Sequence, residues 1–544
     1  MGKITAARAL IRVLRAEGVD TLFTLTGGHI LPLLDAAVVE GMRVVDVRHE
    51  QAAAHAADAS ARITGRIGVA AVTAGPGATD AVTGIAAAWN AASPVLLLVG
   101  RHPTHEELRG GLQEMEHRPL FEGISAWRYT AFQGDRLADV AVTALRHAHA
   151  GRGGPVVVDI PWDVQAAEVA DAAPPQPGRF RAGRGAAADP ATVTEVAGLL
   201  AGAQCPVIFA GTGLRWAQAD PPLAALAEAG RIPVFLNSLA RGAMPWDHPL
   251  LGNRARSSAL GGADVVIALG VDWDFRTRFG GVVAAGARVI QVDAEPRRIG
   301  WNRAADIGVA ADPGVFAAQL LEEAGRFGRS SDTPWVERIR AEEAARLAVA
   351  EQASRSDESP IHPERFAREV AEFFGDDAIV AADGGDIVST TAKWLRTSHP
   401  GHLLDPGPFG TLGVGAPFAL AAKVVRPDTR VGIVFGDGAF GFNGMEYDSL
   451  VRHGLPVVGV VGNDGVWNNI KVLHRAMFPD RVVASDLGIR PYHAMVEALG
   501  GYGEFVDRPG DLRPALERAA DSGLPALVNV HIAEQMRMSS VYGF

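Results

Sequence analysis

Short runs of apolar residues alternate with longer stretches of helical periodicity along most of the chain. The early apolar runs are "TLFTL", "VAAVTAGPG", "PVLLLVG" and "PVVVDI", and the intervening "ATDAVTGIAAAWNAA" has helical spacing. Apolar runs of this length suit strands buried on both faces, which occur in parallel sheets covered by helices. The pattern therefore predicts an α/β protein built from doubly wound parallel sheets.

The pattern falls into three blocks separated by polar or Pro- and Gly-rich segments. "ADAAPPQPGRFRAGRGAAADP" has the composition of a surface linker, and a charged connector precedes the third block. The runs "AIVAADGGD", "RVGIVFGDGAF" and "LPVVGVVGND" echo the spacing of the first block, so the first and third sheets are expected to be related. The predicted division is a first domain over 1–165, a linker over 166–188, a middle nucleotide-type domain over 189–328, a connector over 329–360, a third domain over 361–532 and a tail over 533–544.

Composition narrows the classes of partner. The 544 residues carry a formal net charge of −11, which provides no basic surface for nucleic acid or an anionic membrane. Cys205 is the only cysteine, so a disulfide or thiolate metal site within one chain is not expected. We find neither a signal peptide nor an apolar stretch of about 18 residues that could cross a membrane. The expected partners are small molecules and further copies of the chain, and the expected location is the cytoplasm.

The segment "VFGDGAFGFNGMEYDSLVRHGLPVVGVVGNDGVWNNIK" holds the most informative motif. An apolar run delivers Asp437, between two glycines, to the carboxyl end of a predicted strand, and Asn463 follows 26 positions later at the end of the next one. Ligands of open parallel sheets bind at this edge, and two oxygen donors there suit Mg²⁺ that bridges to phosphate. Gly-Asp-Gly alone is a common turn, and only the paired Asn favours the metal-bridged diphosphate. "GTG" at 211–213 fits a nucleotide turn or a strand end equally well, and a Walker-type loop is absent from the sequence.

The motif and its spacing resemble the thiamine diphosphate enzymes. The resemblance covers nearly the whole chain, with pyrimidine-binding, middle and diphosphate-binding blocks as in the acetolactate synthase group. It implies thiamine diphosphate held through Mg²⁺ by Asp437, Asn463 and the Gly465 carbonyl, with the register open by one residue at "GND". It also implies cofactor contacts from Gly436, Gly438, Ala439 and Asp386.

Glu50, at the end of "VVDVRHE", matches the family's activating acid. By this resemblance its carboxylate hydrogen-bonds N1′ of the aminopyrimidine and so helps the 4′-amino group take the thiazolium proton. A surface glutamate is the default alternative. A zinc helix of His49, Glu50 and His55 is disfavoured, because two histidines six positions apart do not share a helical face.

"GPFGTLGVG" supplies two further implied contacts. Leu412 matches the bulky residue under the bent cofactor, and the Gly410 carbonyl matches the acceptor for its 4′-amino group. These residues lie in the third block and Glu50 in the first, and in the family each site forms between two subunits. The resemblance therefore implies a homodimer or homotetramer.

"FTLTGGHILPLLDA" and the segment around Glu50 resemble the 2-hydroxyacyl-CoA lyase branch, which includes bacterial 2-hydroxyisobutyryl-CoA lyases. The resemblance implies cleavage of a 2-hydroxyacyl-CoA to formyl-CoA and a ketone or aldehyde, or the reverse condensation. Acetolactate synthase or another 2-oxo acid or oxalyl-CoA decarboxylase is the alternative. A non-catalytic subunit is disfavoured, because Glu50 and Asp437 are both present.

Further residues are assigned by the same resemblance. His29, Gln113 and Glu497 are expected to be catalytic beside Glu50, although His29 also fits a core histidine and Glu497 an exposed helix position. The tail "AEQMRMSSVYGF" fits either a frayed end or a lid over the thioester. The expected substrate contacts are Leu112, Tyr492, Arg537, Ser539 and Ser540. The middle block is expected to hold ADP, with FAD less favoured and part of the CoA nucleotide a third option.

Overall fold

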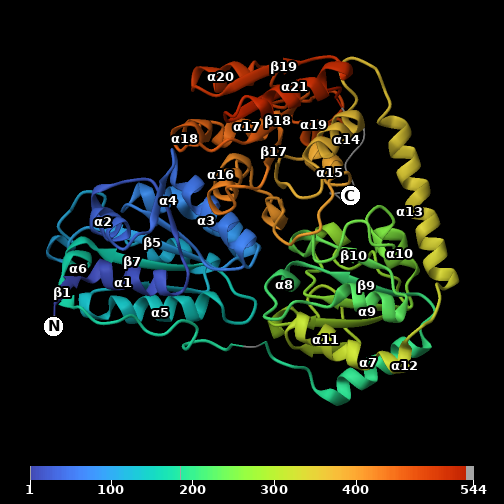
Figure 1. Cartoon of the computed structure of the whole chain (residues 1–544), viewed down its shortest axis with the longest axis horizontal. Coiled ribbons are helices and arrows are strands. Elements are labelled where there is room, and N and C mark those ends of the chain that lie inside the picture. Colours follow the sequence, from blue (N-terminus) through green and yellow to red (C-terminus); the bar gives the residue numbers. More distant parts are fainter. Residues whose placement is uncertain (1, 184, 535–544) are drawn as a thin grey trace. The chain divides into compact units, whose positions relative to one another are not determined.

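A computed structural model describes residues 2–183 and 185–534 (Figure 1). It contains three six-stranded parallel sheets, which confirms the predicted α/β class. Among the described residues, no helix is long and apolar enough to cross a membrane.

The first sheet has the strand order β3-β2-β4-β5-β7-β6. Helices α1, α2 and α5 pack their apolar residues on one face, and α3 and α4 contact each other and the central strands. The strands are β2 (Thr21–Thr24), β3 (Arg43–Asp46), β4 (Gly68–Val72), β5 (Val95–Arg101), β6 (Trp127–Thr130) and β7 (Val156–Pro161). The helices are α1 (Ala6–Ala16), α2 (Leu31–Val39), α3 (Glu50–Thr64), α4 (Pro76–Asn90), α5 (Leu137–Ala148) and α6 (Trp162–Ala166), and β1 (Lys3–Thr5) pairs antiparallel with β8 (Glu168–Ala170).

Helix α3 is buried almost all round, which its many alanines allow. A Cβ on Gly68 of β4 would lie 1.9 Å from the Ala57 carbonyl oxygen, so the helix and the strand need a glycine at their contact. The one strongly charged pair inside α3, Asp58 with Arg62, is fully buried and joined at 2.6 Å. The helix begins at Glu50, and the His49 side chain caps it by accepting the Gln51 N–H at 3.1 Å.

The middle sheet has the order β11-β10-β9-β12-β13-β14, which in its own count is 3-2-1-4-5-6. This is the order of doubly wound dinucleotide-binding sheets. Its strands are β9 (Pro206–Ala210), β10 (Val234–Leu236), β11 (Leu251–Gly252), β12 (Val265–Leu269), β13 (Arg288–Asp293) and β14 (Ile307–Ala310). Its helices are α7 (Pro190–Gly202), α8 (Thr212–Arg215), α9 (Leu223–Gly230), α10 (Arg256–Gly262), α11 (Pro313–Glu322) and α12 (Ala324–Phe327), followed by the long connector helix α13 (Pro334–Ala353).

The third sheet has the order β16-β15-β17-β18-β20-β19. Counted within each sheet, the first and third both run 2-1-3-4-6-5, so the expected relation between them is confirmed. Its strands are β15 (Ile379–Asp383), β16 (Leu403–Leu404), β17 (Val431–Gly436), β18 (Val458–Asn463), β19 (Tyr502–Val506) and β20 (Ala526–His531). Its helices are α14 (Pro363–Phe374), α15 (Asp386–Thr391), α16 (Gly415–Val425), α17 (Asp437–Asn443), α18 (Glu446–Arg452), α19 (Asn468–Met477), α20 (Tyr492–Ala498) and α21 (Pro509–Asp521).

The chain forms two compact units, and their boundaries differ from a division into one unit per sheet. The first unit joins the first sheet to 406–427 and 443–455, which carry α16 and α18. The second unit contains the middle sheet and the strands of the third. The predicted domain boundaries remain predictions.

Candidate active site

Asp437 lies at the carboxyl end of β17 and is the first residue of α17. The backbone N–H of Gly438 donates to its Oδ1 at 2.7 Å, and that of Gly465 donates to its Oδ2 at 2.8 Å. Burial raises the pKa of Asp437 to about 6 despite these bonds. The carboxylate is therefore fixed in place and short of positive charge.

Asn463 ends the neighbouring strand β18, one residue after the Gly436–Gly462 pair of the ladder. Its Nδ2 donates to Asn529 Oδ1 at 3.0 Å and to the Arg490 carbonyl at 3.2 Å. Its Oδ1 is buried and accepts no hydrogen bond from the residues that the structure describes. A buried amide oxygen beside a carboxylate is the donor set that Mg²⁺ takes, so these residues fit the predicted metal.

The sequence analysis missed Asn468 at this edge, and it covered Asp464 only through the register left open by one residue at "GND". Burial, with Asp437 as the second cause, raises the pKa of Asp464 to about 7. Asn468 donates to Asp386 Oδ2 at 2.9 Å, while its own Oδ1 is buried and has no hydrogen-bond partner within 2–183 and 185–534. The sequence signal for Asn468 is the "NN" of "GVWNNIK", which directly follows the "GND" turn.

The Gly465 carbonyl, a predicted metal ligand, already accepts two backbone hydrogen bonds. This oxygen accepts the N–H groups of Leu487 at 2.7 Å and Gly488 at 2.8 Å. Metal ligation by the carbonyl would require at least one of these donors to give way. The glycine itself is explained by its φ of 73°, in the left-handed region that side chains avoid.

The other predicted cofactor residues of this block lie around the same turn. A Cβ on Gly438 would lie 2.2 Å from the Trp467 ring, so that glycine makes room for the tryptophan. Gly436 ends β17 without such a clash, and Ala439 is 2% exposed. Tyr492 packs on Phe440 with ring centroids 5.1 Å apart, and burial, then the charge of Asp437, raises its pKa.

Glu50 begins α3 and faces the turn that starts α4. Its side chain is 8% exposed, and a Cβ on Gly77 would lie 3.4 Å from its Oε1. Burial is the main reason that its pKa is raised. A buried carboxyl with increased proton affinity suits the predicted hydrogen bond to a ring nitrogen.

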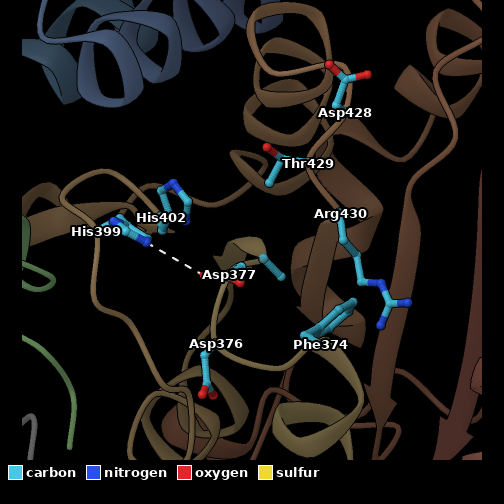
Figure 2. A pocket seen from close by; sticks show the side chains of 9 residues that line it. Phe374, Asp376, Asp377, His399, His402, Asp428, Thr429 and Arg430 are labelled. Carbon is cyan, nitrogen blue, oxygen red and sulfur yellow. Dashed lines mark ion pairs between the residues drawn. The ribbon is translucent and has the colours of Figure 1, made fainter.

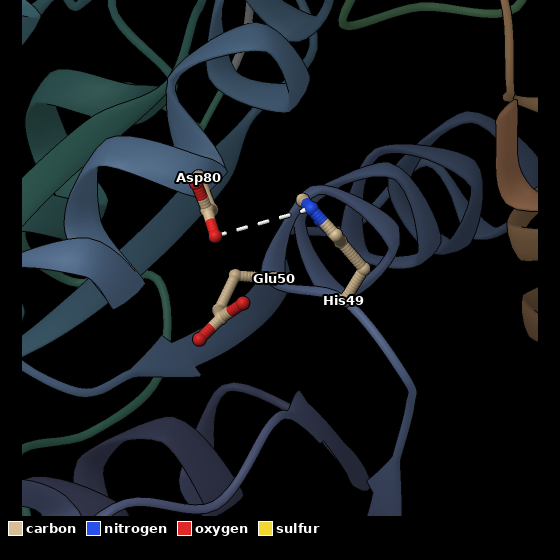
Figure 3. Close-up of side chains that lie close together, drawn as sticks. All are labelled: His49, Glu50 and Asp80. Carbon is tan, nitrogen blue, oxygen red and sulfur yellow. Dashed lines mark ion pairs between the residues drawn. The ribbon is translucent and has the colours of Figure 1, made fainter.

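His49, Glu50 and Asp80 place one possible ligand atom each within 4.8 Å of one another (Figure 3). His55, the third residue of the disfavoured zinc site with His49 and Glu50, does not belong to this group. His55 is fully buried against Phe418, and burial lowers its pKa to about 3. Asp80 instead lies 3.9 Å from His49 Nε2.

His29 and Gln113 gather beside the same turn. His29 Nδ1 lies 3.1 Å from Thr73 Oγ1, the Gln113 side chain also bonds the ring, and burial lowers the pKa of His29. Gln113 has a φ of 59°, and a Cβ on Gly75 would meet its carbonyl oxygen at 2.9 Å. Thr73, which our sequence analysis did not single out, bonds His29 and, like Glu50, lies beside Gly77 at the start of α4.

The remaining predicted residues occupy varied environments. Leu112 is 75% exposed. Gly410 has a φ of 66° with open space around its Cα, and Leu412 is half-buried. Glu497 is exposed and packs its side chain on Gly503 of β19. Three further predictions lie outside the described residues, those for Arg537, Ser539 and Ser540.

The "GTG" turn after β9 is explained by packing. The N–H of Gly211 bonds the Leu269 carbonyl at 2.9 Å, and that of Gly213 bonds the Gly270 carbonyl at 2.8 Å. A Cβ on Gly211 would lie 2.8 Å from the Gly270 oxygen. The glycines thus allow β9 and β12 to end close together.

A cavity of about 530 Å³ lies at the amino-terminal ends of strands in the third sheet, away from their carboxyl ends; Figure 2 shows its lining residues. It is lined by residues that precede β15, β16 and β17, including Asp377, His399 and Arg430. His399 Nε2 lies 3.6 Å from Asp377. Because ligands of such sheets bind at the carboxyl ends, this cavity is separate from the Asp437 site.

Comparison with known proteins identifies the family. Residues 4–120, 193–320 and 383–530 match the N-terminal, central and C-terminal domains of thiamine pyrophosphate enzymes. The chain is 42% identical to the acetolactate synthase large subunit IlvG of Mycobacterium tuberculosis, over 96% of this chain and 95% of that protein. It is 36% identical to human 2-hydroxyacyl-CoA lyase 2, over 96% and 89% of the two chains. The chain therefore belongs to the thiamine diphosphate-dependent enzymes, in the family of the acetolactate synthases and 2-hydroxyacyl-CoA lyases.

Proposed function

We propose that this enzyme cleaves the C1–C2 bond of a 2-hydroxyacyl-CoA, releasing formyl-CoA and a ketone or aldehyde, and that it can catalyse the reverse condensation. The observation that carries the proposal is the buried His29, which interacts with Thr73 and Gln113 beside the start of α4, the turn that Glu50 also faces. Near-full-length similarity to 2-hydroxyacyl-CoA lyases supports it.

The chemistry asks for a neutral base near the substrate hydroxyl. As the C1–C2 bond breaks, the 2-hydroxyl group becomes a carbonyl and must lose its proton. Burial lowers the pKa of His29, so its ring is neutral near pH 7 and can take up that proton. Gln113 and Thr73 orient the ring, and Tyr492 and Leu112 are proposed to contact the acyl group.

Thiamine diphosphate, when bound, supplies an acidic thiazolium carbon and a cationic ring that accepts the electron pair of the breaking bond. Glu50 would hold a proton at N1′ of its pyrimidine. Asp437 and Asn463 would hold Mg²⁺ and through it the diphosphate, with Asp386 and the turn at Gly436 and Gly438 around them. Gly410 and Leu412 are proposed to position the pyrimidine.

A second function, acetolactate formation from pyruvate, is favoured by the 42% identity to an acetolactate synthase. One experiment separates the two. The protein, loaded with thiamine diphosphate and Mg²⁺, is incubated with 2-hydroxyisobutyryl-CoA or with pyruvate, and products are followed by mass spectrometry. If the wild type forms formyl-CoA and acetone and the Glu50→Gln variant does not, the lyase is supported. If acetolactate forms from pyruvate and no formyl-CoA appears, the lyase proposal is overturned.

We also infer that the middle block binds ADP, with FAD as the alternative. The 3-2-1-4-5-6 strand order supports a nucleotide at the carboxyl ends of the strands. Arg241, Arg256 and Arg276 follow three of these strands, and burial, then the other two arginines, lowers the pKa of Arg256 to about 10. Among the described residues, Arg276 is the one of these three that forms an ion pair, with Asp274 at 2.6 Å. Chromatography of nucleotide released from the purified protein, with Arg256→Ala as comparison, tests this.

We infer a homodimer or homotetramer with sites completed between subunits, as the family resemblance implies. Mixing inactive Glu50→Gln with inactive Asp437→Ala chains tests it. If each site takes one half from each chain, mixed dimers regain activity. If each chain builds its own site, mixing restores none.

A further inference from the structure

The short turn that carries Glu50 is held by a helix from far along the chain. This turn, residues 46–50, runs from the last residue of β3 to the first residue of α3. Helix α18 lies about 400 residues later, yet it belongs to the same compact unit. Side chains of α18 make polar contacts with both the backbone and the side chains of the turn.

Glu446 makes the central contact. Its carboxylate accepts the Arg48 backbone N–H, with Oε1 at 2.9 Å and Oε2 at 3.2 Å. The Ser449 hydroxyl donates to Oε2 at 2.6 Å and so fixes the orientation of the carboxylate. Since Arg48 is two residues before Glu50, this bond sets the path of the backbone into α3.

Two neighbouring residues hold the start of the turn. The Arg452 guanidinium pairs with the Asp46 carboxylate, and His453 Nε2 lies 2.9 Å from the Asp46 carbonyl oxygen. The turn also bonds its own sheet, because the Val47 N–H donates to the Thr24 carbonyl at 2.9 Å. The backbone is thereby fixed at Asp46, Val47 and Arg48.

Placing a carboxylate at this position is costly. Glu446 is 1% exposed, and burial raises its pKa to about 7 although Ser449, Arg48 and Arg452 favour its charged form. A buried charge needs hydrogen bonds or a partner charge to offset its desolvation. Here it gives a charge-assisted bond to the backbone beside Glu50.

We propose that Glu446 is a positioning residue for the cofactor-activating carboxylate: its bond to the Arg48 N–H sets where Glu50 stands. This rests on the proposed role of Glu50 and adds a residue that controls it. Removing the acceptor takes away the part-buried hydrogen bond that holds the Arg48 N–H, so the turn is free to shift. A shift of the turn carries Glu50 with it.

The test uses the full-length protein loaded with thiamine diphosphate and Mg²⁺. Glu446→Ala removes the acceptor, and Glu446→Gln keeps an acceptor of the same length. The matched control, Asp448→Asn, removes a carboxylate of the same helix that lies 3.7 Å from the Arg48 side chain without taking its backbone N–H. The measurements are kcat, KM, cofactor affinity and the near-ultraviolet circular dichroism bands of the aminopyrimidine tautomers.

We expect Glu446→Ala to lower kcat at least tenfold, to change KM and cofactor affinity less than threefold, and to alter the tautomer bands. Glu446→Gln should recover most of kcat, and Asp448→Asn should stay within twofold of the wild type. Wild-type kcat and tautomer bands in Glu446→Ala would overturn the inference. If that variant does not fold, Ser449→Ala serves instead, and an unchanged tautomer spectrum would count against the inference.

The outcomes distinguish this inference from the proposed function. If the wild-type protein neither binds thiamine diphosphate nor turns over either substrate, the proposed function fails. If it binds the cofactor and is active while Glu446→Ala behaves identically, only the role of Glu446 fails.

Discussion

The first and third sheets share one strand order, yet they carry opposite kinds of chemistry at their carboxyl edges. The third sheet brings together Asp386, Asp437 and Asp464, and their electrostatic coupling contributes to the raised pKa of Asp464. The first block places the carboxylate of Glu50 beside the uncharged Thr73, with Asp80 and His49 as its charged or titratable neighbours. Under the proposed function, one scaffold would provide a cation site in one copy and a proton-transfer site in the other.

The difference between the two sheets arises at the strands whose carboxyl ends carry the polar residues. In the third sheet, Asp437 and Asn463 follow adjacent central strands, so the ladder itself brings their side chains to one edge. In the first block, Glu50 follows β3, the outermost strand, and depends on contacts from other elements. We expect the metal half to tolerate little change and the Glu50 half to be adjustable.

The largest effect should come from the cation side of the comparison. Asp437→Ala removes a carboxylate that organises both Gly438 and Gly465. We expect Mg²⁺-dependent binding of thiamine diphosphate to weaken more than about 100-fold. Isothermal titration measures it, with Asp428→Ala, at the opposite edge of the sheet, as control. Equal affinity in Asp437→Ala and wild type would refute the metal site.

The proton-transfer side should respond differently. Glu50→Gln keeps the size of the side chain but cannot supply a proton to a ring nitrogen in the same way. We expect kcat to fall about 10² to 10⁴-fold, the range of general acid–base effects, with Mg²⁺ affinity unchanged. Steady-state kinetics and metal titration check this, and a parallel loss of metal affinity would contradict the division of roles. The exposed Glu122→Gln is a suitable control.

Glu446 should give a pH-dependent effect on stability. Its pKa is raised from 4.5 to about 7, so the folded protein holds its proton more tightly than the unfolded chain. The resulting stabilisation is fully present below pH 4.5 and is lost as pH rises through 7. At about 1.4 kcal/mol per pKa unit the loss is at most about 3.5 kcal/mol.

Denaturant unfolding of wild type and Glu446→Gln between pH 5 and pH 8 measures this contribution. The difference between the two proteins should increase in favour of the glutamine variant as pH rises. A difference independent of pH would show that Glu446 does not titrate in this range.

The smallest effect is expected at Leu112. Its side chain is 75% exposed, so Leu112→Ala should change the free energy of unfolding by less than about 0.5 kcal/mol. If the residue contacts the acyl group, KM for the acyl-CoA should increase while kcat changes little. An unchanged KM would remove Leu112 from the substrate site.

The sequence by itself determined the α/β class, the three blocks and the relation between the first and third. Buried parallel strands must be continuous apolar runs, and such runs are visible without a structure. It also singled out Asp437 and Asn463, because residues at the ends of adjacent strands in one sheet meet at one edge.

Only the tertiary structure showed how those residues are supported. The bond of Glu446 to the Arg48 N–H joins positions 398 residues apart. The side-chain oxygens of Asn463 and Asn468, which have no partner in the described part of the chain, become evident only once the surrounding segments are placed in space. The local pattern around Glu446 is that of any amphipathic helix, so its sequence holds no sign of this partner. Burial and hydrogen-bond partnership depend on contacts between segments distant in sequence, and no local spacing rule encodes them.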